Sequence, residues 1–202
     1  ASAHGPVKIL FPMVGSVDEV LRLHAIFDET RAQLAEQGYD FATDLPVGIM
    51  VEVPSALLVL PRMLDEVDFV SVGTNDLVQY LLACDRDNPW VSRLYDPYHP
   101  AVIWALDFVA RCASDAGKPC TVCGEVAGDY ATALLLFGMG FSGVSVAPNF
   151  VPQVKYVLRE TTAEEARSLA DRVRGLDSGP AIREVLEDAR RRLHEGQSTP
   201  GA

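Results

Sequence analysis

Short apolar runs alternate along this chain with longer segments of helical spacing, and this alternation constrains its fold more than any other feature. The apolar runs are Lys8–Phe11, Val47–Val51, Phe69–Val72, Thr121–Cys123 and Gly143–Val146. The helical patterns that follow them include Val17–Gln37, Pro54–Leu64, Pro100–Ala116, Tyr130–Phe137 and Val151–Leu158. Near-continuous apolar strands separated by helices are typical of parallel βα units. We therefore predict an α/β fold with about five parallel strands.

The C-terminal part changes character, because two charged amphipathic patterns follow each other with no strand between them. They are Thr161–Val173 and Pro180–His194, and Thr162 with the following glutamates forms a plausible helix start. We expect residues 1–160 to form the α/β unit and residues 161–194 to add C-terminal helices to the same domain. The last residues, 195–202, are expected to be a disordered tail.

Composition excludes several classes of protein. The chain has 202 residues, 49% of them hydrophobic, and a formal net charge of -11, which argues against a nucleic-acid or anionic-membrane surface. No apolar run approaches the ~18 residues of a transmembrane helix, and the N-terminus lacks the pattern of a signal peptide. Four cysteines without a tight framework favour a cytoplasmic protein. The chain begins close to a strand and without Met, so we expect it to be a piece of a longer protein.

Polar side chains follow three of the predicted strands. Glu52 comes directly after the second strand, Asn75 and Asp76 follow the third, and Cys123 ends the fourth. In parallel βα folds the carboxyl ends of the strands carry the site, because the loops there converge. Glu52 and Asp76 could share a divalent cation with water and phosphate oxygens. The alternative at this stage is that both cap helices or form ion pairs, with Asp76 as an N-cap.

An anionic ligand beside a cation also needs a positively charged partner, and Arg86 follows the Asp76 helix. Its guanidinium could form a bidentate hydrogen-bonded pair with a phosphate or carboxylate. The alternative is a surface ion pair with Asp85 or Asp87.

The four cysteines separate into different roles. Cys120 and Cys123 lie three apart in a strand, so they point to opposite faces, and a redox pair or a zinc site is disfavoured. Cys120 and Cys112 are expected to be buried, and Cys84 to be a helix-face thiol without an evident role. Cys123, at a strand end with the carboxylates, is the candidate catalytic thiol. His99 before Pro100 is expected to form a turn or cap.

Four motifs, GIMVEVPSA, VDFVSVGTNDLVQYLLACDRDN, YDPYHPAV and CGEVAGD, resemble one known family. They are similar to the phosphoenolpyruvate-binding domain of phosphoenolpyruvate-protein phosphotransferase, which is enzyme I of the bacterial phosphotransferase system. The resemblance runs from about Lys8 to Arg159. VEVPS and VKYVLR look more like the nitrogen-branch paralogue than the sugar-branch enzyme.

The resemblance implies a (β/α)₈ TIM-type barrel, of which this chain would form the second part. It implies Mg²⁺ bound by Glu52 and Asp76, phosphoenolpyruvate contacts from Asn75, Asp76 and Arg86, and Cys123 as general acid. In the implied reaction the phosphoryl group passes to a histidine of a separate N-terminal domain and then to a histidine-containing phosphocarrier protein. Pyruvate is released.

The chain also departs from the family. A complete barrel needs eight strands, and the family's further arginines and its phosphohistidine segment have no counterpart in this sequence. We therefore expect an open, curved sheet whose edges need cover, a homodimer, and a fragment that is inactive alone. Two alternatives stay open: an enzyme of the pyruvate phosphate dikinase or phosphoenolpyruvate synthase type, and a non-catalytic dimerisation module.

Overall fold

The fold is built on one sheet of five parallel strands, β1 to β5, that lie side by side in chain order in the computed structural model, which describes residues 1–195. The strands are β1 (Ile9–Phe11), β2 (Val47–Val51), β3 (Phe69–Gly73), β4 (Cys120–Cys123) and β5 (Gly143–Ser145). Successive βα units in this order form the second part of a (β/α)₈ barrel. The predicted fold class is confirmed, with strand bounds shifted by one residue at most.

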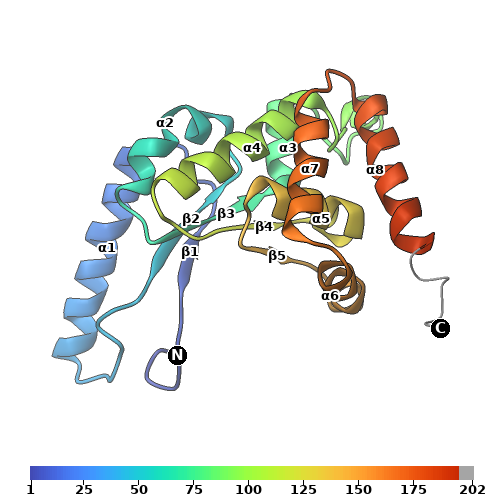
Figure 1. Ribbon diagram of the computed structural model, residues 1–202. Helices are drawn as coiled ribbons and strands as arrows, with labels where there is room; N and C mark the ends of the chain where they lie inside the picture. The colour runs from blue at the N-terminus through green and yellow to red at the C-terminus, as the bar shows by residue number, and fades with distance from the viewer. Residues whose placement is uncertain (196–202) are drawn as a thin grey trace, which may run out of the picture.

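Eight α-helices within residues 1–195 connect and follow the strands (Figure 1). They are α1 (Val17–Glu36), α2 (Pro54–Leu64), α3 (Thr74–Leu81), α4 (Pro100–Asp115), α5 (Tyr130–Met139), α6 (Val151–Glu160), α7 (Ala163–Arg174) and α8 (Gly179–Glu195). Short 3-10 turns add η1 (Ser92–Leu94), η2 (Glu125–Gly128) and η3 (Pro148–Phe150). The tail was predicted to begin at Glu195, but Glu195 is the last residue of α8, and residues 196–202 lie outside the described part.

Several helices begin where local chemistry satisfies their free amide groups. Ser16 and Glu19 form a reciprocal capping box at α1, and Thr162 and Glu165 form another at α7. His99 caps α4 through Nδ1, which accepts a hydrogen bond from the amide two residues later. The helix start predicted near Thr162 and the capping role predicted for His99 are both confirmed.

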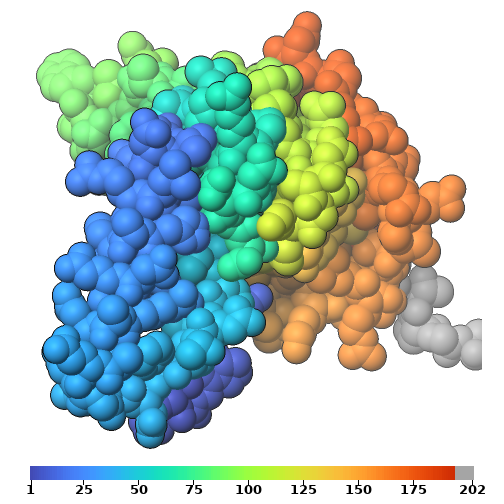
Figure 2. All heavy atoms as spheres, turned by 90° about the vertical axis from the view of Figure 1, so that its left-hand side faces the viewer, coloured from blue at the N-terminus to red at the C-terminus, as the bar shows by residue number. Residues whose placement is uncertain are grey.

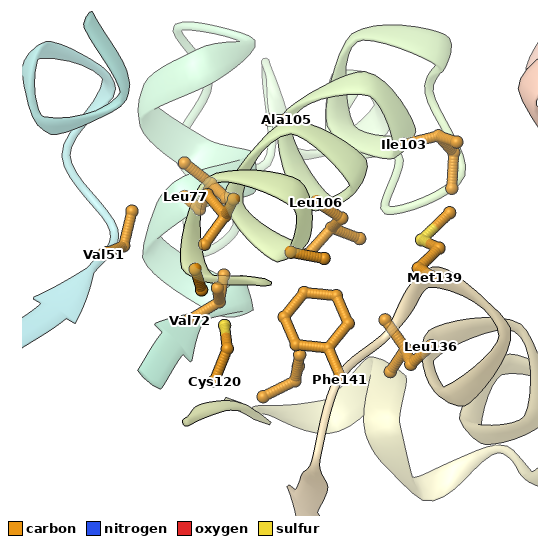
Figure 3. Close-up of a cluster of buried hydrophobic side chains, with 14 of the residues drawn as sticks. Val51, Val72, Leu77, Ile103, Ala105, Leu106, Cys120, Leu136, Met139 and Phe141 are labelled. Atoms are coloured by element: carbon orange, nitrogen blue, oxygen red, sulfur yellow. The ribbon is translucent and has the colours of Figure 1, made fainter. Parts of the chain in front are cut away.

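Strand alternation divides the sheet into a helix-covered face and an uncovered face. The covered face is fully apolar, and Figure 3 shows Leu106 of α4 and the Phe141 ring gathered over it. Each fully buried aliphatic side chain of this kind contributes roughly 1.5–3 kcal/mol. The covered strand residues are Ile49, Val51, Val70, Val72, Cys120 and Val122. The opposite face carries mainly small and polar side chains: Gly48, Met50, Ser71, Gly73, Thr121 and Cys123.

Two sequence interpretations are wrong. Asp76 does not cap α3, because the helix begins directly at Thr74 and Asp76 lies in its first turn. Cys84 is not on a helix face, because α3 ends at Leu81 and Ala83 turns the chain with a φ of 50°. Cys84 is instead buried in the following loop, 8% exposed.

The loop from α3 to α4, residues 82–99, stands out from the body of the molecule at the corner shown in green in Figure 2. Trp90, which lies in this loop, is 85% exposed. No helix in the described part of the chain is long and apolar enough to cross a membrane.

Candidate active site

The carboxyl ends of β2, β3 and β4 bring the predicted residues onto the uncovered face of the sheet. Gly73 pairs with Cys123, which pairs with Ser145, and Glu52 follows the pair Val51–Val72 by one residue. A Cβ at Gly73 would lie 2.4 Å from Glu52 Oε2, so the glycine leaves the space that this carboxylate occupies. The strand register therefore aligns Glu52 and Cys123 in one transverse row.

Glu52 is a buried carboxylate, only 3% exposed. Its Oε1 accepts a hydrogen bond of 2.7 Å from the amide of Met13, a residue held in the left-handed region with a φ of 57°. Burial raises the pKa of Glu52, the Met13 amide lowers it in part, and the negative charge of Asp76 raises it further. A cation bound between the two carboxylates would relieve that repulsion.

Gln79 links Asp76 to Arg86. Its Nε2 donates to Asp76 Oδ1 at 3.2 Å, and its Oε1 accepts from the backbone amide of Arg86 at 2.9 Å. The side-chain amide of Gln79 thus uses both its nitrogen and its oxygen in hydrogen bonds, and these fix the orientation of the amide. Any group bound by Asp76 is thereby coupled to the start of the loop that carries Arg86.

Arg86 pairs with Glu125 rather than with its sequence neighbours. Arg86 Nη1 lies 3.4 Å from Glu125 Oε1, and the Glu125 side chain is 81% exposed. The alternative of a pair with Asp85 or Asp87 is therefore wrong. The backbone amide of Glu125 also donates to Asn75 Oδ1 at 3.3 Å. Because an exposed pair contributes only ~0–1 kcal/mol, an incoming anion can compete for this guanidinium.

Two hydrogen bonds, one to its carbonyl and one from its thiol, hold Cys123 at the end of β4. Its carbonyl accepts from Thr74 Oγ1 at 2.8 Å, and its thiol lies 3.4 Å from the carbonyl of Val72. Gly124 follows with a φ of 119°, and a Cβ there would lie 2.1 Å from Thr74 Oγ1, so the turn requires glycine. Burial raises the pKa of the Cys123 thiol, a hydrogen bond with Ser71 lowers it in part, and the nearby carboxylates raise it again.

A cavity of about 620 Å³ opens beside this thiol. Its lining includes Asn75, Cys123, Glu125, Ser145 and Phe150. This volume falls within the range of small-molecule sites, roughly 300–1,000 Å³. The thiol therefore has room for a reacting molecule on its open side.

The pair Glu52 and Asp76 suits a hard cation. Each carboxylate has one oxygen engaged in a hydrogen bond, to Met13 and to Gln79 respectively. Within residues 1–195, no group of three or more His, Cys, Asp or Glu side chains is close enough to hold a metal ion. Mg²⁺ commonly binds through one or two carboxylates and completes its shell with water and phosphate oxygens. The donor set fits such an ion.

Comparison with known proteins identifies the family of this chain. Residues 1–163 match the family described as "PEP-utilising enzyme, PEP-binding domain". The chain belongs to this family. Phosphoenolpyruvate-protein phosphotransferase of Haemophilus influenzae is 40% identical to this chain over 188 residues, 93% of this chain and 33% of that protein. The protein of the same name from Cupriavidus necator is 42% identical over 173 residues, 86% of this chain and 30% of that protein.

The chain thus spans about a third of the length of the curated relatives it matches. Among solved structures, a citrate lyase from Burkholderia xenovorans LB400 superimposes with a TM-score of 0.57 at 17% identity, over 97% of this chain and 66% of that chain. RipC from Yersinia pestis gives a TM-score of 0.52 at 13% identity, over 79% of this chain and 66% of that chain. These two likenesses concern the fold alone.

Sequence reasoning missed two groups at the site. Gln79 lies three residues after Asp76 on a helix, a spacing that puts two side chains on one face and could have revealed it. The Met13 amide could not have been found in this way, because it is a backbone group 39 residues from its carboxylate.

Proposed function

We propose that this chain is part of a phosphoenolpyruvate-protein phosphotransferase that binds phosphoenolpyruvate with Mg²⁺. The observation that carries the proposal is the convergence of two carboxylates and a thiol at the carboxyl ends of neighbouring strands, with Arg86 held beside them through Glu125. The names of the relatives favour this function over an ATP-dependent dikinase or synthase. Glu52 and Asp76 would hold Mg²⁺, which when bound neutralises charge on the phosphoryl group and on the enolate.

The chain's own residues bind the substrate and move a proton. Arg86 attracts the anionic groups of phosphoenolpyruvate, and Asn75 offers its side-chain amide to the same ligand. After the phosphoryl group leaves, the thiol of Cys123 donates its proton to the enolate carbon. A C–H bond forms, the S–H electron pair stays on sulfur, and the thiolate regains a proton from water. A raised pKa suits this role because it keeps the thiol protonated at neutral pH.

The phosphoryl acceptor in this proposal is a histidine outside residues 1–202, which passes the group to a histidine-containing phosphocarrier protein. The chain alone would then not catalyse the turnover of phosphoenolpyruvate. We propose further that residues 1–160 are the barrel part, that residues 161–194 are helices of the same domain, and that the protein acts in the cytoplasm. The presence of four free thiols supports a reducing compartment.

A homodimer is also proposed. Large apolar side chains lie exposed on the helical side and the 82–99 loop, among them Leu58 at 84%, Trp90 at 85% and Trp104 at 54%. Exposed apolar patches often mark protein interfaces.

The function is tested in the full-length protein that carries this chain, supplied with phosphoenolpyruvate, Mg²⁺ and its phosphocarrier protein. Pyruvate formation is measured through a coupled dehydrogenase. Cys123→Ala should lower pyruvate release at least 100-fold while phosphoenolpyruvate binding changes less than threefold, in line with the loss of a general acid. Cys120→Ala, on the other face of β4, is the matched control and should keep its turnover. Absence of pyruvate with the wild-type protein would refute the function, and unchanged turnover in Cys123→Ala would refute the role of the thiol.

A further inference from the structure

Helix α8 lies outside the 163 residues that match the family, and the candidate site residues all precede it. Two of its arginines nevertheless reach the segments that carry the site. Arg183 forms an ion pair with Asp96 in the 82–99 loop, and Arg190 Nη2 lies 2.8 Å from Asp129 Oδ1 at the start of α5. Figure 1 shows the light-green loop beside α8.

The Asp96 contact fixes the far end of the 82–99 loop. Asp96 Oδ1 accepts the amide of Tyr98 at 2.8 Å as well as the guanidinium of Arg183. The Arg183 guanidinium lies 5.3 Å from the centroid of the Tyr98 ring. The first turn of α8 packs directly on the same carboxylate, since a Cβ at Gly179 would lie 2.5 Å from Asp96 Oδ2. The loop end is therefore held by an ion pair, by a cation–π contact and by close packing.

The Asp129 contact fixes the end of the segment that begins at Cys123. Asp129 Oδ2 accepts both the amide and the hydroxyl of Thr132, at 2.9 and 2.6 Å, and so caps α5. Thr132 is 2% exposed, and its hydroxyl lies 3.0 Å from the hydroxyl of Tyr98. Arg183, Tyr98, Thr132, Asp129 and Arg190 thus form one connected network that begins and ends on α8.

The 82–99 loop and the segment from Cys123 to Asp129 are each anchored twice, once at the candidate site and once on α8. At the site, Arg86 contacts Gln79 and Glu125. On the far side, the two α8 arginines hold the same two segments. A long loop whose regular structure is a single 3-10 turn is mobile unless its ends are fixed.

We propose that Arg183 and Arg190 are positioning residues that set the relative placement of Arg86 and Cys123. Helix α8 acts on the site only through these two segments and touches no substrate. This inference rests on the proposed function for its kinetic part, but its structural part concerns this chain alone.

The first test measures amide hydrogen exchange in the 202-residue chain. The double variant R183Q/R190Q should exchange at least tenfold faster than wild type in residues 84–99 and 124–131, while β2 and β3 keep their protection. R192Q is the control, because it removes one positive charge from the same helix at a side chain that forms no ion pair with the described residues. Equal exchange in the double variant and in R192Q would overturn the proposal.

The second test measures steady-state kinetics in the full-length protein. R183Q/R190Q should raise the KM for phosphoenolpyruvate about tenfold through Arg86 and lower kcat severalfold through Cys123, and R183K/R190K should recover part of both. Faster exchange with kinetics equal to those of R192Q would overturn the positioning role. A wild-type protein that forms no pyruvate would refute the proposed function instead, and the exchange measurement would then decide alone whether α8 holds the two segments.

Discussion

Helices α5 and α7 meet at Gly138, and replacing this residue with alanine tests how closely they pack. A Cβ at Gly138 would lie 1.9 Å from the carbonyl oxygen of Ala166 and 3.2 Å from the Cβ of Ala170. The oxygen belongs to the backbone of α7, so no side-chain rotation can make room. Reaching an ordinary contact of 3.4 Å would require the helices to separate by 3.4 − 1.9 = 1.5 Å.

The expected cost follows from this displacement. Overpacking of this kind costs typically ~1–3 kcal/mol, and a rigid backbone neighbour favours the upper end. The higher helix propensity of alanine offsets roughly 0.5–1 kcal/mol of this loss in the free energy of unfolding. We therefore expect a net loss of about 2 kcal/mol, which corresponds to a fall in Tm of roughly 4–8 °C for a chain of this size.

Urea denaturation and calorimetry at neutral pH measure the effect. Gly175→Ala is the matched control, since Gly175 ends α7 with a φ of -80° and its Cβ would meet only Arg172 O at 3.7 Å. It should be neutral or stabilising by ~0.4–1 kcal/mol. If Gly138→Ala matched wild type or Gly175→Ala in stability, the close approach of α5 to α7 would be refuted.

Two further predictions concern β4 and α3. Because burial raises the pKa of the Cys120 thiol from 9.0 to about 12, the unfolded chain ionises first and stability falls as pH rises above 9. The stability advantage of wild type over Cys120→Ala should therefore shrink by about 1.4 kcal/mol between pH 8 and pH 10 in urea denaturation, and a constant difference would contradict the burial. Gln79→Met loses the hydrogen bonds to Asp76 and Arg86, so calorimetric binding of phosphoenolpyruvate with Mg²⁺ to the full-length protein should weaken about tenfold. Wild-type affinity in that variant would show that the bridge does not order the site.

The strand pattern alone was enough to predict the sheet and the end of the sheet at which the candidate site residues lie. Parallel strands that are buried on the helix side appear in the sequence as apolar runs. Polar residues directly after these runs mark the carboxyl ends of the strands. Alternation within β4 correctly separated Cys120, which is buried, from Cys123, which faces the cavity. These features depend on spacing within one element, so a single sequence contains them.

Contacts between distant segments could not be predicted in the same way. The alternative interpretation of Arg86 pairs it with Asp85 or Asp87, but its guanidinium meets Glu125, 39 residues away. The α8 contacts span 87 residues for Asp96 and 61 for Asp129. Charged helices offer many equivalent partners, and only the packing of α8 selects among them.

All strands of the sheet run in one direction, so the candidate site residues gather at one end and the loops at the other end carry none of them. The turns around Gly38 and Gly117 lie at that opposite end, and a Cβ at either glycine would meet no atom within 4 Å. Peptide insertions or fluorescent labels attached there would report on folding or assembly at a distance from the reacting groups.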